Sequence, residues 1–391
     1  MTSLAEQTGT GTGAPAQPPR HPSRPPRGRP ALYLSYGQDM ALLNTRPKRV
    51  AVLGLLILAL LLPFSIPDDL LHLLALGFVA TIGAIGLNLV TGYAGQISLG
   101  HAFFLGVGAY TAAVISGDPD GRTTGFGITF LPIWLLAAGA VAGLTGLLVA
   151  PLAVRLRGLY LAVVTLGLVF LGLHIFREWD SVTGGPGLGR PGAVPELFGI
   201  NLATDGPNFT RDQKLYLTVL VLMVLFTLAA ANLARSKVGR AFAAVRDRDI
   251  AASIIGVSLT RYKMLAFAIS SFYAGCAGAL LTMVIGFFDP TSWNLQLSVQ
   301  YLAMILIGGA GTISGSIMGA LFITLLPRLT RELPALMPFI SDSVTDMPNI
   351  FQVEIMLYGL LIIGFLIFEP RGLYGIWVRF RNYWKSWPFS Y

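Results

Sequence analysis

The chain has 391 residues, of which 54% are hydrophobic and only 12% are charged, and its mean hydropathy is +0.68. A soluble domain carries about 25% charged residues, so this composition excludes a soluble globular protein and indicates a membrane-embedded chain. One cysteine and four histidines exclude a disulfide scaffold and argue against a His/Cys metal site. We expect neither a metal ion nor a cofactor.

The N-terminal segment 1–49 differs from the rest of the chain. Seven prolines lie between Pro15 and Pro30, interleaved with four arginines. Such a stretch cannot bury enough apolar surface to offset the entropy of ordering, which predicts a disordered cytoplasmic tail. Its positive charge could bind anionic lipid or nucleic acid. Retention of the N-terminus inside the cell is the simpler interpretation, and we expect no nucleic-acid partner.

From Val50 onward, apolar runs recur at about the 20 helical residues that cross a bilayer core of about 30 Å. They predict an all-α, polytopic membrane protein with ten transmembrane helices, at 50–66, 70–90, 98–115, 130–149, 159–176, 215–234, 264–287, 297–309, 313–330 and 353–368. The run at 297–309 is short enough to be a partial span. The transmembrane domain of this prediction covers 50–368, and 369–391 form a second cytoplasmic tail.

Charge placement supports the predicted topology. With the N-terminus inside, the internal segments hold 20 of the 27 Lys and Arg residues and the external segments hold seven. This bias is the positive-inside pattern, and an even number of spans also returns the C-terminus to the cytoplasm. Within the spans, Glu354 is the only acidic residue and lies at an edge, so the carboxylates typical of proton pathways are missing.

Two Gly-rich polar breaks interrupt the apolar runs, a first break at 86–104 and a second at 308–315. The string Ala-Gly-x-Ile-Ser occurs in both, at 94–98 and 310–314. Breaks in corresponding halves are typical of translocation paths in transporters built from repeats, although close packing through small residues gives the same pattern. The candidate path residues are Asn88, Tyr93, Gln96, Ser98, His101, Thr312 and Ser314.

The sequence contains no phosphate-binding motif placed between a predicted strand and a predicted helix, where such a motif could bind phosphate. The G-x-G-x-x-G match at 187–192 contains Pro191, follows no predicted strand and opens no predicted helix. No Walker A motif occurs. The chain therefore lacks the P-loop of an ATPase.

The internal loop 235–263 is the largest internal segment between two spans. Its alanines favour a helix, with Gly256 as a stop and Ser258 as the next N-cap. The charged run 246–249 leaves Phe242, Val245, Ile254 and Ile255 for apolar contacts. Such an amphipathic helix could dock a cytoplasmic partner or lie on lipid headgroups, and the residues alone favour neither.

The same loop carries a resemblance to a known family. Gly-Arg-Ala-Phe at 239–242, Ala-Val-Arg-Asp at 244–247 and Thr-Arg-Tyr-Lys-Met-Leu-Ala-Phe at 260–267 resemble the LivM-type inner-membrane permeases of branched-chain amino acid ABC importers. Further stretches of that family are matched by Gly-Tyr-Ala-Gly-Gln-Ile-Ser-Leu-Gly-His at 92–101, Thr-Gly-Gly-Pro-Gly-Leu at 183–188, Leu-Ile-Gly-Gly-Ala-Gly-Thr at 306–312 and Phe-Glu-Pro-Arg-Gly-Leu at 368–373.

The resemblance implies a non-enzymatic transport subunit in the bacterial inner membrane. Its implied partners are a second homologous permease, two cytoplasmic ATPase subunits, an external solute-binding protein and membrane lipid. The resemblance implies that the loop 235–263 is the ATPase-coupling segment. The residues expected to make this coupling contact are Arg240, Phe242, Val245, Arg246, Asp247 and Ile254. We expect Phe242, Val245 and Ile254 to pack against the ATPase and the charged pair to bridge the contact. A urea or short-chain amide permease, or an ion-coupled carrier, are the alternative functions.

Overall fold

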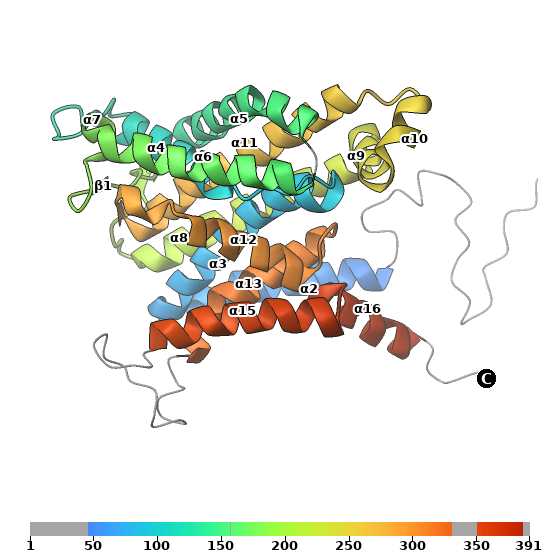
Figure 1. Cartoon of the computed structure of the whole chain (residues 1–391). Helices are drawn as coiled ribbons and strands as arrows, with labels where there is room; N and C mark the ends of the chain where they lie inside the picture. Colours follow the sequence, from blue (N-terminus) through green and yellow to red (C-terminus); the bar gives the residue numbers. More distant parts are fainter. Residues whose placement is uncertain (1–45, 157, 331–349, 386–391) are drawn as a thin grey trace, which may run out of the picture. The chain divides into compact units, whose positions relative to one another are not determined.

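The computed structural model describes residues 46–156, 158–330 and 350–385. The long helices are α2 (Arg46–Leu61), α3 (Asp68–Asn88), α4 (His101–Ser116), α5 (Leu131–Arg155), α6 (Leu159–Glu178), α8 (Arg211–Arg235), α11 (Leu259–Ile285), α12 (Leu295–Gly308), α13 (Ile313–Thr330) and α15 (Ile350–Phe368). Each of the ten predicted apolar runs overlaps one of them, so the expected all-α architecture is confirmed (Figure 1).

Five described segments are long and apolar enough to cross a membrane by length and composition: Asp68–Tyr93, Leu131–Arg155, Leu159–Glu178, Arg211–Arg235 and Leu259–Ile285. Shorter helices are α7 (Asp180–Thr183), α9 (Lys237–Asp247), α10 (Asp249–Ile254) and α16 (Gly372–Lys385), with a π-helix at Leu89–Tyr93 and 3₁₀ turns at Leu62–Phe64 and Pro290–Ser292. Strand β1 (Arg190–Pro191) pairs antiparallel with β4 (Phe287–Phe288), and β2 (Glu196–Leu197) with β3 (Ile200–Asn201).

Contacts divide the chain into two compact units, Met1–Val50 and Ala51–Tyr391. In the first unit the structure describes only 46–50, which are helical, so α2 begins four residues before the predicted run. The tail expected to be disordered at 1–45 lies outside the described residues. The second unit contains the remaining elements named above.

Local sequence explains where several helices begin and end. Thr210 and Gln213 form a capping box at the start of α8, in which each side chain bonds the other residue's backbone N–H. Two carboxylates in the first turn of α3, Asp68 and Asp69, complement the helix dipole. At the end of α11, Gly286 adopts the left-handed conformation (φ +84°) that glycine permits.

Helix α11 forms the centre of the second unit and contacts α3, α4 and α5. Small residues allow the close approach: a Cβ added at Gly278 would lie 1.9 Å from the carbonyl oxygen of Leu105. A Cβ at Gly139 of α5 would likewise lie 2.6 Å from the sulfur of Cys276. Close packing through small residues is the usual means of joining helices within lipid, and Gly139 and Gly278 serve it here.

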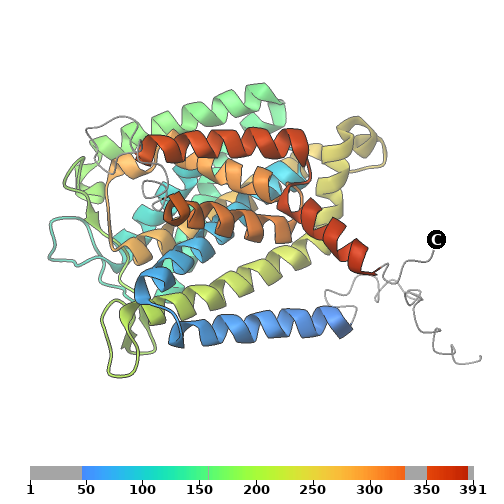
Figure 2. The same cartoon turned by 90° about the horizontal axis from the view of Figure 1, so that it is seen from below.

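The structure differs from the predicted segments in three places. Helix α4 starts at His101 rather than at 98, because the chain from 94 to 100 is irregular. The expected single helix within 235–263 is two helices, α9 and α10, separated at Arg248, whose backbone is extended (φ −155°, ψ 98°). The C-terminal segment contains α16, and Figure 2 shows the chain turning between α15 and α16.

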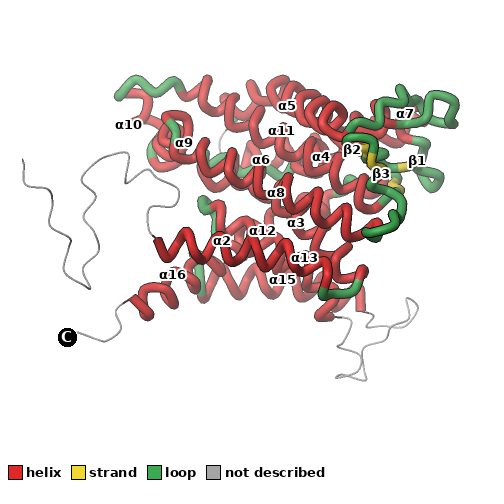
Figure 3. The backbone as a smooth tube through the Cα atoms, turned by 180° about the vertical axis from the view of Figure 1, so that it is seen from behind, coloured by secondary structure: helices red, strands yellow, loops and turns green. Residues whose placement is uncertain are grey.

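Different loops lie at the two opposite ends of the second unit. Figure 3 shows α9 and α10 at one end and β1, β2, β3 and α7 at the other. The first end, called the coupling end below, also holds both polar breaks and the start of α16. The second, called the hairpin end, also holds the first turns of α3 and α8.

Candidate functional site

The first break is built on a π-helix that follows α3. The amide of Ala94 donates to the carbonyl of Leu89 (3.2 Å), and that of Gln96 donates to Val90 (2.9 Å). A π-helix interrupts regular helical bonding and is frequent at functional sites. The break therefore leaves the membrane helix locally wider and less regular than its neighbours.

The second break connects α12 to α13 and repeats a conformation of the first. Gly95 has φ +68° and Gly311 has φ +77°, and these glycines occupy the same position in the two Ala-Gly-x-Ile-Ser strings. Left-handed backbone is open to glycine and rare for other residues. The two strings thus share a left-handed glycine turn, and these two turns are called the matching turns below, although 97–98 stay irregular and 313–314 begin α13. Gly315 and Gly319 of α13 pack against Gly308.

Asn88 joins the two breaks. Its amide nitrogen donates to the carbonyl of Thr312 (2.9 Å) and to the hydroxyl of Ser316 (2.7 Å). Its amide oxygen accepts from the backbone N–H of Gly311 (2.8 Å). Since the side chain is only 1% exposed and a lost partner would leave buried polar groups unpaired, Asn88 acts here as a clamp between α3 and the second break.

Arg246 of α9 lies between the two matching turns. Its Nη1 donates to the carbonyl of Gly92 in the π-helix (2.8 Å). A Cβ added at Gly95 would lie 2.7 Å from Cγ of Arg246, and one added at Gly311 would lie 2.9 Å from its Nη1. One side chain from the loop 235–263 therefore contacts both breaks, and glycine is required on either side of it.

A cleft of about 330 Å³ opens beside this contact. It is lined mainly by polar and charged residues, among them Gln96, Arg246, Asp247, Arg248, Asp249 and Lys263. Gln96 is 5% exposed, and neither atom of its amide has a hydrogen-bond partner among the described residues. Buried polar groups are normally paired, which marks Gln96 as a cleft-lining residue with unused bonding capacity.

The apolar face of α9 packs inward, which corrects part of the expectation for this loop. Phe242 is 1% exposed and Val245 6% exposed, and the ring of Phe242 meets that of Tyr262 edge-on with centroids 6.4 Å apart. These two residues are internal anchors of α9. The outward apolar residues lie on and just after α10, where Ile254 is 81% exposed and Ile255 is 75% exposed.

The charged residues of α9 remain at the surface. Arg246 Nε and the carboxylate of Asp247 form an ion pair within the chain (3.1 Å). Arg240 is exposed and donates from Nη1 to the carbonyl of Arg235 (3.0 Å). Within the chain, Arg246 and Asp247 thus pair with one another, and their pairing across an ATPase contact stays a prediction.

Most of the candidate path residues have structural partners. His101 is 2% exposed and its ring packs against Tyr301 with centroids 5.0 Å apart. The hydroxyl of Ser98 accepts from Gly100 (3.3 Å), and that of Thr312 donates to the carbonyl of Gly309 (2.8 Å). Tyr93 and Thr312 are half-buried, and Ser314 is the one exposed side chain of the predicted set.

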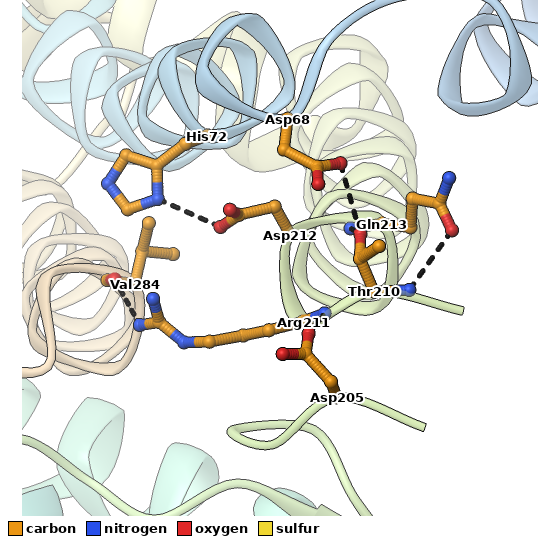
Figure 4. A network of polar contacts seen from close by, with 8 residues as sticks. All are labelled: Asp68, His72, Asp205, Thr210, Arg211, Asp212, Gln213 and Val284. Carbon is orange, nitrogen blue, oxygen red and sulfur yellow. Dashed lines mark hydrogen bonds and ion pairs between the residues drawn. The ribbon is translucent and has the colours of Figure 1, made fainter. Parts of the chain in front are cut away.

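At the hairpin end, a polar network joins α3, α8 and α11 (Figure 4). His72 and Asp212 pair across α3 and α8 (3.1 Å), and the hydroxyl of Thr210 donates to Asp68 (3.1 Å). Arg211 donates from its backbone N–H to Asp205 (2.7 Å) and from Nη2 to the carbonyl of Val284 (3.0 Å).

Arg190 is a buried arginine at this end. The sequence did not indicate its role, because Arg190 stood out only as part of the dismissed G-x-G-x-x-G match at 187–192. It is 1% exposed and donates to the carbonyls of Val182, Ala113 (2.6 Å) and Thr124 (3.2 Å). Burial lowers the pKa of Arg190 to about 10, while nearby Tyr110 opposes the shift. The guanidinium therefore stays charged at neutral pH and ties the loop after α6 to α4.

A metal-based function finds no support in the described part of the chain, which contains no group of three or more His, Cys, Asp or Glu side chains able to hold an ion. An arginine, a clamp asparagine and two glycine turns link a surface helix pair to the middle of the helix bundle.

The chain is similar to several transport permeases of known name. The chain is 32% identical to the high-affinity branched-chain amino acid transport system permease protein LivM of Escherichia coli over 347 residues, covering 84% of this chain and 76% of that protein. It is 26% identical to LivH of the same system and organism over 318 residues (77% and 92%). It is 31% identical to the autoinducer 2 import system permease protein LsrC of Enterobacter sp. over 206 residues (51% and 55%).

No solved structure matches the chain. The family model for the branched-chain amino acid transport system permease component matches residues 70–366, which include both breaks, α9, α10 and Arg190. The chain therefore belongs to this family, the multi-pass membrane permeases of bacterial ABC transporters.

Proposed function

We propose that this chain is one permease of an importer for branched-chain, hydrophobic amino acids, driven by ATP hydrolysis on separate subunits. The observation that carries the proposal is similarity over most of the chain to both LivM and LivH. The likeness to an autoinducer 2 permease covers only about half of it. A second homologous permease would complete the translocation path, and an external binding protein would deliver the substrate.

Uptake by the reconstituted complex tests this function. Vesicles are loaded with ATP and supplied with leucine, valine, alanine or urea together with the binding protein. We expect leucine and valine uptake that requires ATP and persists with a proton or sodium ionophore, because the spans lack the carboxylates of ion-coupled carriers. Preferential urea uptake would identify an amide permease. Uptake without ATP that collapses with the ionophore would identify an ion-coupled carrier.

The topology proposed for this function has ten spans with both termini in the cytoplasm. In support of it, described residues of the predicted internal segments lie around the coupling end, where Arg246 contacts Gly92 and Gly311. Two predicted external stretches, around β1 and β4, pair with one another at the hairpin end. Since the chain's only cysteine, Cys276, is buried, a new cysteine at exposed Ser253 or Asp120 can be labelled selectively. We expect the two to react from opposite sides, and labelling from the same side would reject the topology.

Energy transfer in this proposal runs from α9 and α10 to the two breaks. An ATPase would contact the exposed isoleucines near α10, and its movement would reach the π-helix through the Arg246–Gly92 hydrogen bond. The paired breaks would then form the inner mouth of the path, with Tyr93, Gln96 and Ser314 nearest the opening. Asn88 and His101 would keep the surrounding helices packed.

Arg246→Met tests this route, because methionine removes the donor while filling part of the same space. We expect the variant to retain its ATPase subunits on purification but to lose most ATP-driven uptake. Arg248→Met is the matched control, since Arg248 is an exposed arginine two residues away, and it should transport normally. Normal uptake by Arg246→Met would show that the hydrogen bond to Gly92 does not transmit the movement.

A further inference from the structure

The hairpin β2–β3 ends in an exposed aromatic residue held in an unusual conformation. Glu196 pairs with Asn201 and Leu197 with Ile200, so Phe198 and Gly199 form a two-residue turn. Both have positive φ (+49° and +81°), as a type I′ turn requires and as Asn-Gly usually supplies. Bulky residues rarely adopt such a φ, and Phe198 is the one non-glycine example among the described residues.

The conformation does not serve packing within the chain, because the side chain of Phe198 is 84% exposed. Unfavourable backbone conformations persist where the surrounding structure enforces them, and they concentrate at functional positions. The turn therefore presents an aromatic ring outward at the cost of local strain. What the ring contacts must lie outside the chain's own core.

The hairpin is fixed to the start of α5. The backbone N–H of Glu196 donates to the carbonyl of Thr129 (3.0 Å), and the hydroxyl of Thr129 donates to the carboxylate of Glu196. The ring of Phe198 meets that of Phe130 edge-on, with centroids 6.0 Å apart. Because Phe130 directly precedes α5, the hairpin tip lies beside the first turn of a membrane helix.

The apolar surface of the hairpin continues into that of α5. This helix exposes a stripe at helical spacing, formed by Ile133, Leu136, Val141, Leu144 and Leu148. Its 25 residues extend about 37 Å, more than the about 30 Å of the hydrocarbon core. The first turn of α5, and Phe130 with it, therefore reaches the boundary between acyl chains and headgroups.

The composition of the loop fits this boundary rather than water. Glu196 is the only ionisable residue between Arg190 and Asp205, and its carboxylate is hydrogen-bonded to Thr129. Ile200, directly across the hairpin from Leu197, is 57% exposed. Aromatic side chains are enriched at membrane–water interfaces, and interfacial elements bury apolar side chains at the boundary between headgroups and acyl chains.

We propose that the β2–β3 hairpin is a membrane-interface anchor that inserts Phe198 and Ile200 into the acyl–headgroup boundary at the hairpin end. Insertion extends the lipid-facing stripe of α5 beyond the helix. It also tethers the long loop between α6 and α8 to the bilayer, so that this loop cannot move freely while the coupling end changes shape.

Spin labelling of the full chain in its complex tests the anchor. The complex carrying Phe198→Cys or Ile200→Cys is labelled in nanodiscs of phosphatidylethanolamine and phosphatidylglycerol. Collision with oxygen, which is enriched in lipid, is compared with collision with a water-soluble nickel chelate. Leu144→Cys on α5 serves as the lipid reference and Asp120→Cys, in an exposed loop, as the water reference. The unmodified chain should give no signal, because Cys276 is buried.

We expect both hairpin labels to show an oxygen-to-nickel collision ratio several-fold above that of Asp120→Cys and close to that of Leu144→Cys. A ratio matching Asp120→Cys would place the hairpin in water and overturn the proposal. Weak collision with both reagents would mean that a protein partner covers the tip, which also overturns it. Transport activity does not enter the readout, so the result is independent of the substrate.

Discussion

The two ends of the second unit satisfy their polar groups in different ways. At the hairpin end, Arg190 donates to three backbone carbonyls of its own chain, and Figure 4 shows further polar contacts among α3, α8 and α11. At the coupling end, a single hydrogen bond from Arg246 reaches the first break, the amide of Gln96 has no partner among the described residues, and large isoleucines face outward.

This difference separates an end held by many hydrogen bonds within the chain from an end held by few. A few bonds between rigid elements permit those elements to move relative to one another, whereas many satisfied bonds resist it. The comparison predicts that mutations of the hydrogen-bonded residues at the hairpin end act on stability, while those of surface residues at the coupling end act on transport.

The largest expected effect is on Arg190. Arg190→Leu leaves three carbonyls without donors in a buried place, which should lower the free energy of unfolding by about 3–5 kcal/mol. Thermal unfolding in detergent measures it. Arg122→Leu is the control, because exposed Arg122 makes one bond, to the carbonyl of Gly189 (2.6 Å), and should cost less than about 1 kcal/mol. Equal losses would contradict the special role of Arg190.

In the loop 235–263, substitutions of Phe242 and Ile254 should have opposite effects on stability and on ATPase binding. Phe242→Ala creates a cavity under α9 and should destabilise the chain by about 3–5 kcal/mol. Ile254→Ser changes an exposed side chain, so stability should shift by no more than about 0.5 kcal/mol, while binding of the ATPase weakens. Unfolding and co-purification of the ATPase are measured together. Normal ATPase retention by Ile254→Ser would exclude this residue from the docking surface.

The variants Gly95→Ala and Gly158→Ala separate the effect of backbone strain from that of a contact with Arg246. Both have positive φ (+68° and +56°), but a Cβ at Gly95 would press on Arg246, whereas nothing lies within 4 Å of one at Gly158. Either alanine should cost about 1–2 kcal/mol of backbone strain. Only Gly95→Ala should also displace Arg246 and reduce ATP-driven uptake. Similar uptake by both variants would mean that the Arg246 contact is dispensable.

The smallest effect belongs to the ion pair of His72 and Asp212. The two side chains are 33% and 23% exposed, so solvent screens their attraction. Asp212→Asn should change the free energy of unfolding by less than about 1 kcal/mol, measured by the unfolding midpoint. A loss as large as that of Arg190→Leu would show that the network depends on this pair.

The sequence alone determined the membrane-embedded, all-α architecture, because apolar runs of bilayer length leave a helix as the only way to satisfy the backbone. It also located both polar breaks and the loop 235–263, since glycine strings and charged runs interrupt the apolar pattern. The ends of α2, α4 and α9 were less predictable, because local signals compete there with packing.

Only the tertiary structure decided which side chains meet. Phe242 was expected to face a partner, but an amphipathic helix has the same pattern whether its apolar face meets another protein or its own bundle, and here Tyr262 covers it. Asn88 and Arg246 find their partners more than 150 residues away along the chain. Such long-range contacts depend on how the helices pack, and that arrangement leaves no local trace in the sequence.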